Sequence, residues 1–256
     1  MLLALDIGNT TIAIGVFKGK KILHDWRIKT DKDTTADEYA VMLLNLFQRA
    51  GIKPDRIEAA ILSSVVPPLS PVFQAVAKDL FGVEALVVGP GLKTGMPILY
   101  ENPLEVGADR VVAAIAAFGK YGGPCVIVDF GTATTFDAVS DKGEYLGGAI
   151  APGVLISAEA LYLKTARLPR IEIKKPKKAI GRTTVASMQS GLYFGYIGLV
   201  SNTIAQIRKE LGREAHVIAT GGFGGQIAPE VPAIEAYEPG LVLEGLRILY
   251  ERNKDE

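Results

Sequence analysis

Several residue types that mark specialised proteins are scarce in this chain of 256 residues. It has one cysteine, Cys125, so no disulfide can form within the chain, and only two histidines, His24 and His216, with no cysteine or second histidine nearby in sequence. The 28 basic and 28 acidic residues balance, which implies no long-range attraction to nucleic acid or to an anionic membrane. These shortages exclude a disulfide scaffold and argue against a transition-metal centre.

Long apolar segments are also missing. No apolar run is long enough to span a bilayer, and the N-terminus shows no basic leader followed by a small-residue cleavage site. We therefore expect a soluble, cytosolic protein without a membrane partner. Cys125 lies in an apolar run, so we expect it to be a small buried hydrophobe rather than a nucleophile.

What the chain does contain is an acidic turn between two apolar strands at its start. Residues 2–5 are continuously apolar and lead into Asp6-Ile7-Gly8-Asn9-Thr10-Thr11, after which residues 12–16 are again apolar. A continuous apolar run predicts a central strand buried on both faces. A carboxylate at its end, beside a glycine and side chains that donate hydrogen bonds, suits Mg²⁺-phosphate. A single Gly-Asn turn is, however, more often an ordinary hairpin.

A second copy of this pattern begins at Cys125. An apolar strand again ends in an acid, Asp129, and Phe130-Gly131-Thr132-Ala133-Thr134-Thr135 leads into a returning strand. Asp6 and Asp129 lie about half a chain apart, which indicates a duplicated architecture. We predict two lobes, residues 1–120 and residues 121–256.

The remaining patterns predict the same order of elements in both halves. For the first half we expect strands at 22–28, 57–62 and 85–88, a capped helix between Thr35 and Gly51, a helix after Pro68 and a helix from Pro103 to about Phe118. For the second half we expect strands at 125–129, 135–140, 145–150 and 216–219 and helices at 154–163, 184–211 and 241–252. Three antiparallel strands followed by strands separated by helices predict an α/β fold, a mixed sheet covered by helices in each lobe.

Six motifs along nearly the whole chain carry a family resemblance. They are Asp6-Ile7-Gly8-Asn9-Thr10, Gly107-Ala108-Asp109-Arg110, the Asp129 turn, Gly147-Gly148-Ala149-Ile150-Ala151-Pro152-Gly153, Thr220-Gly221-Gly222 and the segment 240–246. In this order they resemble the type III pantothenate kinases, which are similar to sugar kinases, heat-shock ATPases and actin. The resemblance implies a duplicated ribonuclease H-like (actin-like ATPase) fold with two mixed-sheet lobes around a central cleft. One residue departs from the pattern, because Thr183 stands where the family suggests Asn.

The resemblance also implies an activity, the ATP-dependent phosphorylation of pantothenate to 4'-phosphopantothenate, the first step of coenzyme A synthesis. Asp109 matches the family's proton acceptor, and Asp6 would hold Mg²⁺ through water. Asp129 matches the ligand of a monovalent cation, K⁺ or NH₄⁺. The implied ATP contacts are Asp6, Ile7, Gly8, Asn9, Thr10, Thr11, Ile12, Ala13 and Thr132. The implied pantothenate contacts are Tyr100, Gly107, Ala108, Asp109, Arg110 and Thr184.

The residues themselves leave alternatives open. An acid at a helix start, such as Asp109, is also a plain helix cap, and Asp129 could instead act on Mg²⁺. The helix at 184–211 carries Gly191, Gly195 and Gly198, which allow close helix approach, either in the family's homodimer or within one chain. The same fold could serve a kinase or phosphatase for another small hydroxy acid, or a nucleotide-binding regulator without catalysis.

Overall fold

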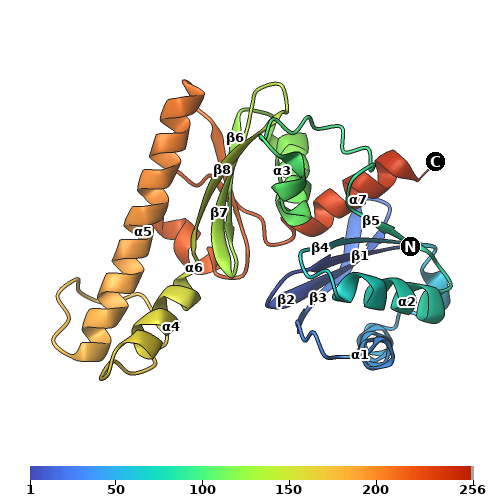
Figure 1. Ribbon diagram of the computed structural model, residues 1–256, viewed down its shortest axis with the longest axis horizontal. Helices are drawn as coiled ribbons and strands as arrows, with labels where there is room; N and C mark the ends of the chain where they lie inside the picture. The colour runs from blue at the N-terminus through green and yellow to red at the C-terminus, as the bar shows by residue number, and fades with distance from the viewer. Residues whose placement is uncertain (255–256) are drawn as a thin grey trace. The chain divides into compact units, whose positions relative to one another are not determined.

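The computed structural model describes residues 1–254 and divides into two compact units, each built on its own sheet (Figure 1). Among the described residues, unit 1 consists of Met1–Pro97, Glu101–Ala116 and the segment from Gly240 onward, and unit 2 of Ile98–Tyr100 and Ala117–Pro239. Along the part of the chain that is described, no helix is both long and apolar enough to cross a membrane.

Unit 1 contains a five-stranded mixed sheet. Its strands, in chain order, are β1 (Leu2–Ile7), β2 (Thr11–Lys18), β3 (Lys21–Lys29), β4 (Ala59–Ser64) and β5 (Ala85–Val87). Its helices are α1 (Ala36–Arg49), η1 (Pro54–Arg56), α2 (Leu69–Phe81), η2 (Pro103–Glu105), most of α3 (Ala108–Tyr121) and α7 (Leu241–Asn253). The spatial order is β3-β2-β1-β4-β5, in which β1 pairs antiparallel to β2 and parallel to β4.

Unit 2 repeats this sheet. Its strands are β6 (Cys125–Phe130), β7 (Ala133–Val139), β8 (Tyr145–Pro152), β9 (His216–Thr220) and β10 (Ala236–Tyr237). Its helices are α4 (Val154–Lys164), α5 (Thr184–Leu211), α6 (Gly224–Ile227) and η3 (Ala228–Glu230). The spatial order β10-β9-β6-β7-β8 matches that of unit 1 when read from the other edge. The duplication predicted from the two acidic turns is therefore confirmed, as is the α/β class with two mixed sheets.

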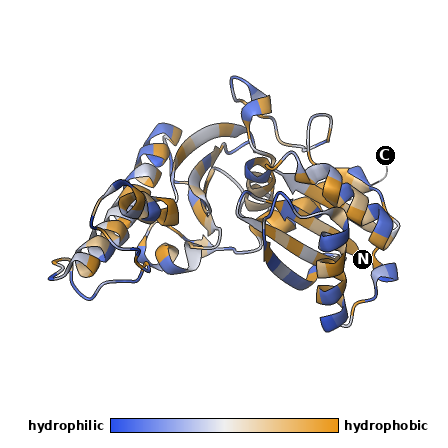
Figure 2. Ribbon diagram, turned by 60° about the horizontal axis from the view of Figure 1, so that its bottom comes forward, coloured by the Kyte–Doolittle hydropathy of each residue, from blue (hydrophilic) through white to orange (hydrophobic). Residues whose placement is uncertain are grey.

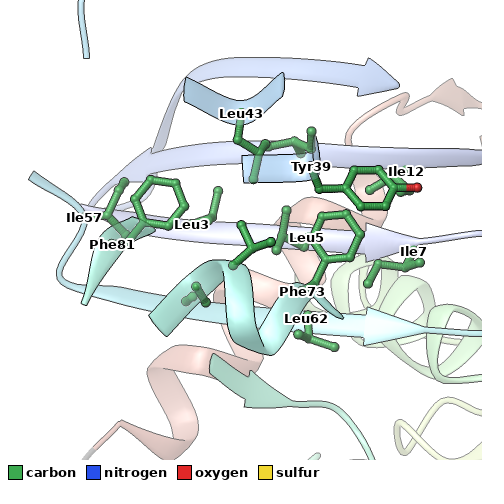
Figure 3. Close-up of a cluster of buried hydrophobic side chains, with 14 of the residues drawn as sticks. Leu3, Leu5, Ile7, Ile12, Tyr39, Leu43, Ile57, Leu62, Phe73 and Phe81 are labelled. Atoms are coloured by element: carbon green, nitrogen blue, oxygen red, sulfur yellow. The ribbon is translucent and has the colours of Figure 1, made fainter. Parts of the chain in front are cut away.

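The central strand of unit 1 separates two environments. Leu3, Leu5 and Ile7 alternate to one face, where they join the buried cluster formed with α1 and α2. Figure 3 shows Phe81 and Ile57 beside Leu3 at one end of this cluster and the Tyr39 and Phe73 rings toward Ile7 and Ile12 at the other. The other face of β1 carries Leu2, Ala4 and Asp6. Asp6 therefore leaves the sheet on the side opposite α1 and α2.

Local sequence accounts for α1. Thr35 and Glu38 form the expected capping box: the Thr35 hydroxyl accepts from the Glu38 backbone N–H, and the Glu38 carboxylate accepts from the Thr35 N–H at 2.9 Å. Gly51 follows the helix with a positive φ of 69°, which glycine adopts without strain. As Figure 2 shows, hydrophobic and hydrophilic residues share the same helices, as expected for helices that cover a sheet on one side only.

The units differ from the predicted division at residue 120 in three places, because residues 98–100 and 117–120 belong to unit 2 and the segment that begins at Gly240 belongs to unit 1. Helix α7 belongs to unit 1, although it comes last in the chain. A Cβ on Gly245 would lie 2.2 Å from the Val112 backbone oxygen, and a Cβ on Gly15 would lie 3.1 Å from Leu243 Cδ1. Glycine at positions 15 and 245 thus lets α7 pack closely against β2 and α3.

Two further details correct the expectations. The helix expected from Pro103 is interrupted, because a short 3₁₀ turn at Pro103–Glu105 ends at Val106 and α3 begins only at Ala108. Strand β10 was not predicted, because its two residues are too short for a periodic pattern. Strands β4, β7 and β8 are each displaced or extended by up to two residues from their predicted ends.

Candidate active site

The first acidic turn joins β1 to β2 in unit 1. The Gly8 backbone N–H donates to the Thr11 carbonyl at 3.1 Å, and a Cβ on Gly8 would lie 2.9 Å from that same oxygen. Thr30, which is buried, holds the turn from the side: its hydroxyl donates to the Gly8 carbonyl at 2.7 Å, and its N–H donates to the Thr10 carbonyl at 3.0 Å. Asn9, Thr10 and Thr11 are exposed. The backbone is thus held while the polar residues of the turn remain accessible to a ligand.

Parallel pairing places a serine beside Asp6. Ser63 is the register partner of Asp6 across β1 and β4, and its hydroxyl donates to Asp6 Oδ1 at 2.7 Å. Ser63 is fully buried, whereas Asp6 is half-buried. This bond constrains one carboxylate oxygen. Ser63 belongs to none of the sequence motifs, and its position directly after a predicted strand is the one local signal for a functional role.

Asp6 lies within electrostatic reach of Asp109. Burial, followed by the charge of Asp109, raises the pKa of Asp6 from 3.8 to about 7, although the Ser63 hydrogen bond acts in the opposite direction. The structure thus brings together two acids that are separated by about a hundred residues in the sequence. An ordinary surface carboxylate would not carry such a perturbation, which is typical of functional sites.

Asp109 lies in the first turn of α3. Its Oδ1 accepts from the backbone N–H of the next residue, Arg110, at 2.9 Å, and a negative charge in the first turn is favoured by the helix dipole. A Cβ on Gly107 would lie 2.5 Å from this oxygen, so a larger residue there would displace the Asp109 carboxylate from its present position. Ala108 and Arg110 are half-buried. The capping interpretation of Asp109 is therefore compatible with the structure, but it does not explain why the acid lies near Asp6.

The second acidic turn, in unit 2, has the same plan with a shorter connection. Asp129 pairs with Thr135 across β6 and β7 and with Thr220 across β6 and β9. Residues 131–133 separate the last strand pair, whereas residues 8–11 do so in the first turn, so the second turn is one residue shorter. Gly221 has a positive φ of 86°, and a Cβ there would lie 2.3 Å from Asp129 Oδ1. The motif Thr220-Gly221-Gly222 thus lets the chain pass directly beside this carboxylate.

The Thr132 turn is also fixed through its backbone. The Gly153 N–H donates to the Thr132 carbonyl at 3.1 Å, and a Cβ on Gly153 would lie 2.3 Å from the same oxygen and 2.6 Å from that of Gly131. Gly131 and Thr132 are exposed. The glycine that ends the motif at 147–153 therefore holds this turn in place.

The pantothenate residues expected from the family are divided between the units. Gly107, Ala108, Asp109 and Arg110 belong to unit 1, whereas Tyr100 and Thr184 belong to unit 2. Tyr100 follows a short bridge between Ile98 and Tyr145, and its ring packs over Gly147, where a Cβ would lie 3.4 Å from it. Thr184 is exposed at the first position of α5.

The departure at Thr183 has a structural explanation. Thr183 is the N-cap of α5, and its hydroxyl accepts from the Ala186 backbone N–H at 3.2 Å. Threonine and asparagine both cap helices in this way. Thr183 therefore retains the capping role that the expected asparagine would have, directly before Thr184.

Not every residue of the expected ATP set offers a side chain. Ile7 and Ile12 are fully buried in the core of unit 1 (Figure 3), so only their backbone atoms could meet a nucleotide. Ala13 pairs with Asp6 across β1 and β2. The side chains that face outward in this segment belong to Asn9, Thr10 and Thr11.

The donor groups fit the expected cations. Within residues 1–254 no three His, Cys, Asp or Glu side chains gather as a metal cluster. Asp6 and the hydroxyls of its turn offer the oxygen donors that Mg²⁺ prefers when phosphates and water complete its coordination. Asp129, next to the backbone of Gly221, carries carboxylate oxygens that would suit a second cation. Burial raises the pKa of Cys125 to about 12, so its thiol is not activated and the expectation of a buried hydrophobe is confirmed.

Comparison with known proteins points to one family. The sequence model of the type III pantothenate kinases matches residues 2–206. The type III pantothenate kinase of Geobacter sulfurreducens is 54% identical over 255 residues, which cover 100% of both chains. The corresponding protein of Moorella thermoacetica is 51% identical over 253 residues, 99% of this chain and 100% of that one.

Solved structures of lower identity share the fold. A Campylobacter jejuni protein described as a Baf family transcriptional activator has a TM-score of 0.61 at 18% identity, covering 99% of this chain and 100% of its own. A protein of Porphyromonas gingivalis described as an N-acetylglucosamine kinase has a TM-score of 0.52 at 13% identity, with the same coverage. These similarities support the duplicated actin-like fold.

Proposed function

Because this chain belongs to the type III pantothenate kinase family, we propose that it transfers the terminal phosphoryl group of ATP to the terminal hydroxyl of pantothenate. The product would be 4'-phosphopantothenate, the first intermediate of coenzyme A synthesis. The identity of half the residues over the full length of the curated relatives supports this substrate.

The observation that carries the proposal is that Asp6 and Asp109, both in unit 1, lie within electrostatic reach of each other. Phosphoryl transfer needs an anchor for the metal-bound phosphates and a group that orients the attacking hydroxyl. Asp6 stands at the end of β1 next to a turn of exposed donors, and Asp109 stands within electrostatic reach of it at the start of α3. Two acids in these positions can divide the two tasks.

Each residue then has a defined role. Asp109 accepts the proton of the pantothenate hydroxyl, and the adjacent Arg110 offers a forked cation to the pantothenate carboxylate. The backbone of Gly8 and the polar side chains of Asn9, Thr10 and Thr11 would contact phosphate oxygens, and Thr132 is a further proposed phosphate contact. Tyr100, Gly107, Ala108 and Thr184 supply the remaining contacts to pantothenate.

Two cations complete the proposal. Mg²⁺, held through water by Asp6, would neutralise charge on the phosphates during transfer. Asp129 would hold a monovalent cation, K⁺ or NH₄⁺. Its geometry beside Gly221 is equally compatible with action on Mg²⁺, so replacing potassium by sodium in the assay is the test of this assignment.

We also propose that the protein is a homodimer that pairs through α5. A Cβ on Gly191, Gly195 or Gly198 would meet nothing within 4 Å, so these glycines do not serve close packing within the described chain. Phe194, on the same helix, is 40% exposed. Sedimentation velocity of the full chain would distinguish a dimer from a monomer.

The experiment that tests the function measures ADP release from ATP and Mg²⁺ with and without pantothenate, in potassium and in sodium. We expect release to require pantothenate and to be faster in potassium. If pantothenate gives no stimulation in either salt, the assigned substrate is wrong, and a kinase or phosphatase for another small hydroxy acid or an inactive regulator becomes the better explanation.

Asp109→Asn is the matched variant for this assay. The amide keeps the size of the side chain and its acceptor for the Arg110 N–H, but it cannot take a proton. We expect pantothenate-dependent turnover to fall by about a hundredfold or more, while the affinity for a nonhydrolysable ATP analogue changes little. Full activity in this variant would leave Asp109 as a helix cap only.

A further inference from the structure

The hydroxyl of Tyr196 contacts β7 directly after the second acidic turn. Tyr196 lies on α5, is 6% exposed, and forms a hydrogen bond with the Thr134 hydroxyl, which is itself fully buried. Thr134 is the register partner of Phe130 and comes two residues after Thr132. The bond therefore joins α5 to the chain directly beside the proposed phosphate contact.

The same hydroxyl has a second partner. The Val154 backbone, at the first position of α4, forms a hydrogen bond with the Tyr196 oxygen. Val154 follows Gly153, whose N–H donates to the Thr132 carbonyl. Tyr196 thus holds both sides of the turn, through Thr134 on β7 and through the start of α4.

Tyr196 also lies near the acid of this turn. Burial raises the pKa of its phenol, the Val154 hydrogen bond opposes that rise, and the charge of Asp129 adds to it. The Tyr196 ring packs against Phe130, with centroids 6.3 Å apart. The phenol of Tyr196 is therefore neutral, is hydrogen-bonded to Thr134 and Val154, and lies near Asp129 and against Phe130.

We propose that Tyr196 is a positioning residue for nucleotide and cation binding by the second turn. This inference rests on the proposed kinase function, because it presumes that Thr132 contacts phosphate and that Asp129 contacts a cation. Its hydroxyl orders the turn through Thr134 and Val154 without touching the ligand itself. Tyr196 belongs to no phosphate-binding motif, because it lies in a stretch of glycines and aromatic residues whose pattern favours an interface.

Tyr193 supplies a matched control on the same helix. It is 2% exposed, and its hydroxyl donates to the Gln226 carbonyl at 3.4 Å, a contact away from the turn. Tyr193→Phe and Tyr196→Phe remove the same atom from the same helix. A general loss of packing in α5 would affect the two variants alike.

The test compares steady-state kinetics of the full chain in both variants. For Tyr196→Phe we expect the KM for ATP and the half-saturating potassium concentration to rise about fivefold to tenfold, because a buried hydrogen-bond partner is removed. The KM for pantothenate should stay within about twofold of the wild-type value. Tyr193→Phe should leave all three constants within about twofold.

A binding readout separates this inference from the proposed function. A nonhydrolysable ATP analogue with Mg²⁺ should raise the melting temperature of the wild-type chain, and less so that of Tyr196→Phe at the same analogue concentration. This measurement needs no turnover. If pantothenate never stimulates ADP release but the two melting shifts differ as expected, the substrate assignment fails and the role of Tyr196 stands.

A double-mutant cycle with Thr134→Val tests the pair directly. Each single variant removes the hydrogen bond between the two hydroxyls and leaves the other hydroxyl facing an apolar group, whereas the double variant places two apolar groups together. We expect the nucleotide affinity of the double variant to be no lower than that of the single variant with the lower affinity. Additive losses, an unchanged KM for ATP in Tyr196→Phe, or equal increases for both substrates would overturn the inference.

Discussion

At the scale of single residues, Asp6 illustrates a conflict between stability and function. Its carboxylate is taken partly out of water and lies near a second acid, so ionisation is unfavourable in the absence of a cation. Mg²⁺ and the donors of the turn would reverse this penalty by favouring the charged form. The residue proposed to anchor the metal is thus one whose charged form the unliganded fold disfavours.

This conflict predicts a pH dependence. The folded-state pKa of Asp6, about 7, is above its ordinary value of 3.8, so the folded chain holds a proton that the unfolded chain has lost between these values. The contribution of Asp6 to stability is therefore largest below pH 4 and is lost as the pH rises to 7.

Asp6→Asn should remove this dependence. The amide stays neutral and keeps an oxygen for the Ser63 hydroxyl. We expect the unliganded variant to melt higher than the wild type at pH 8 and to differ little from it at pH 4, as measured by thermal unfolding without nucleotide. Kinase activity should be lost. A lower melting temperature at pH 8 would show that ionised Asp6 stabilises the fold by a contact other than those described above.

At the scale of elements, helix ends position the proposed substrate residues. Asp109 and Arg110 lie in the first turn of α3, and Thr184 is the first residue of α5. Ends of helices are sensitive to their caps because the first N–H groups have no partner within the helix. The Thr183 cap thus affects both the stability of α5 and the position of Thr184.

Two substitutions at this cap make the argument testable. Thr183→Ala should lower the free energy of unfolding by about 1 kcal/mol, because the Ala186 N–H loses its acceptor. Thr183→Asn should change it by only a few tenths of a kcal/mol, since asparagine also caps. Urea unfolding of both variants provides the measurement. Equal losses in the two variants would mean that the threonine methyl group, rather than the cap, is what stabilises this end of α5.

At the scale of the whole molecule, the chain returns to its first unit. Unit 1 is formed by the first 97 residues, the segment Glu101–Ala116 and the C-terminal segment with α7. Leu241, Leu243, Leu246 and Leu249 of α7 are buried, and Asn253 hydrogen-bonds to the backbone of Lys93. Unit 2 has a separate hydrophobic cluster that uses no residue of α7.

A chain that ends at Pro239 should therefore damage one unit selectively. Without α7, we expect amide protection in β1, β2 and β4 to be lost, while β6 and the buried side of α5 remain protected. Hydrogen exchange followed by mass spectrometry resolves the two sets. Gly245→Ala should weaken the same unit more mildly, through the clash with the Val112 carbonyl. Equal loss of protection in both units would show that they unfold as one.

Local patterns in the sequence were sufficient for most of the fold. The continuous apolar strands before Asp6 and Asp129 predict central strands, and β1 and β6 are central. The capping box at Thr35 and the helix at 184–211 were predicted correctly because they depend on neighbours within one helical turn. The break before α3 was missed because Pro103 also fits the start of an ordinary helix.

The sequence by itself determined the duplicated plan, the two acidic turns and the family, because these reside in contiguous motifs. Only the tertiary structure decided that Ser63 hydrogen-bonds to Asp6 with Asp109 within electrostatic reach, that Thr30 holds the first turn, that Tyr196 hydrogen-bonds to Thr134 and that α7 belongs to unit 1. Each of these contacts joins residues that are far apart in the chain. Such contacts depend on strand register and helix packing, which no local pattern specifies.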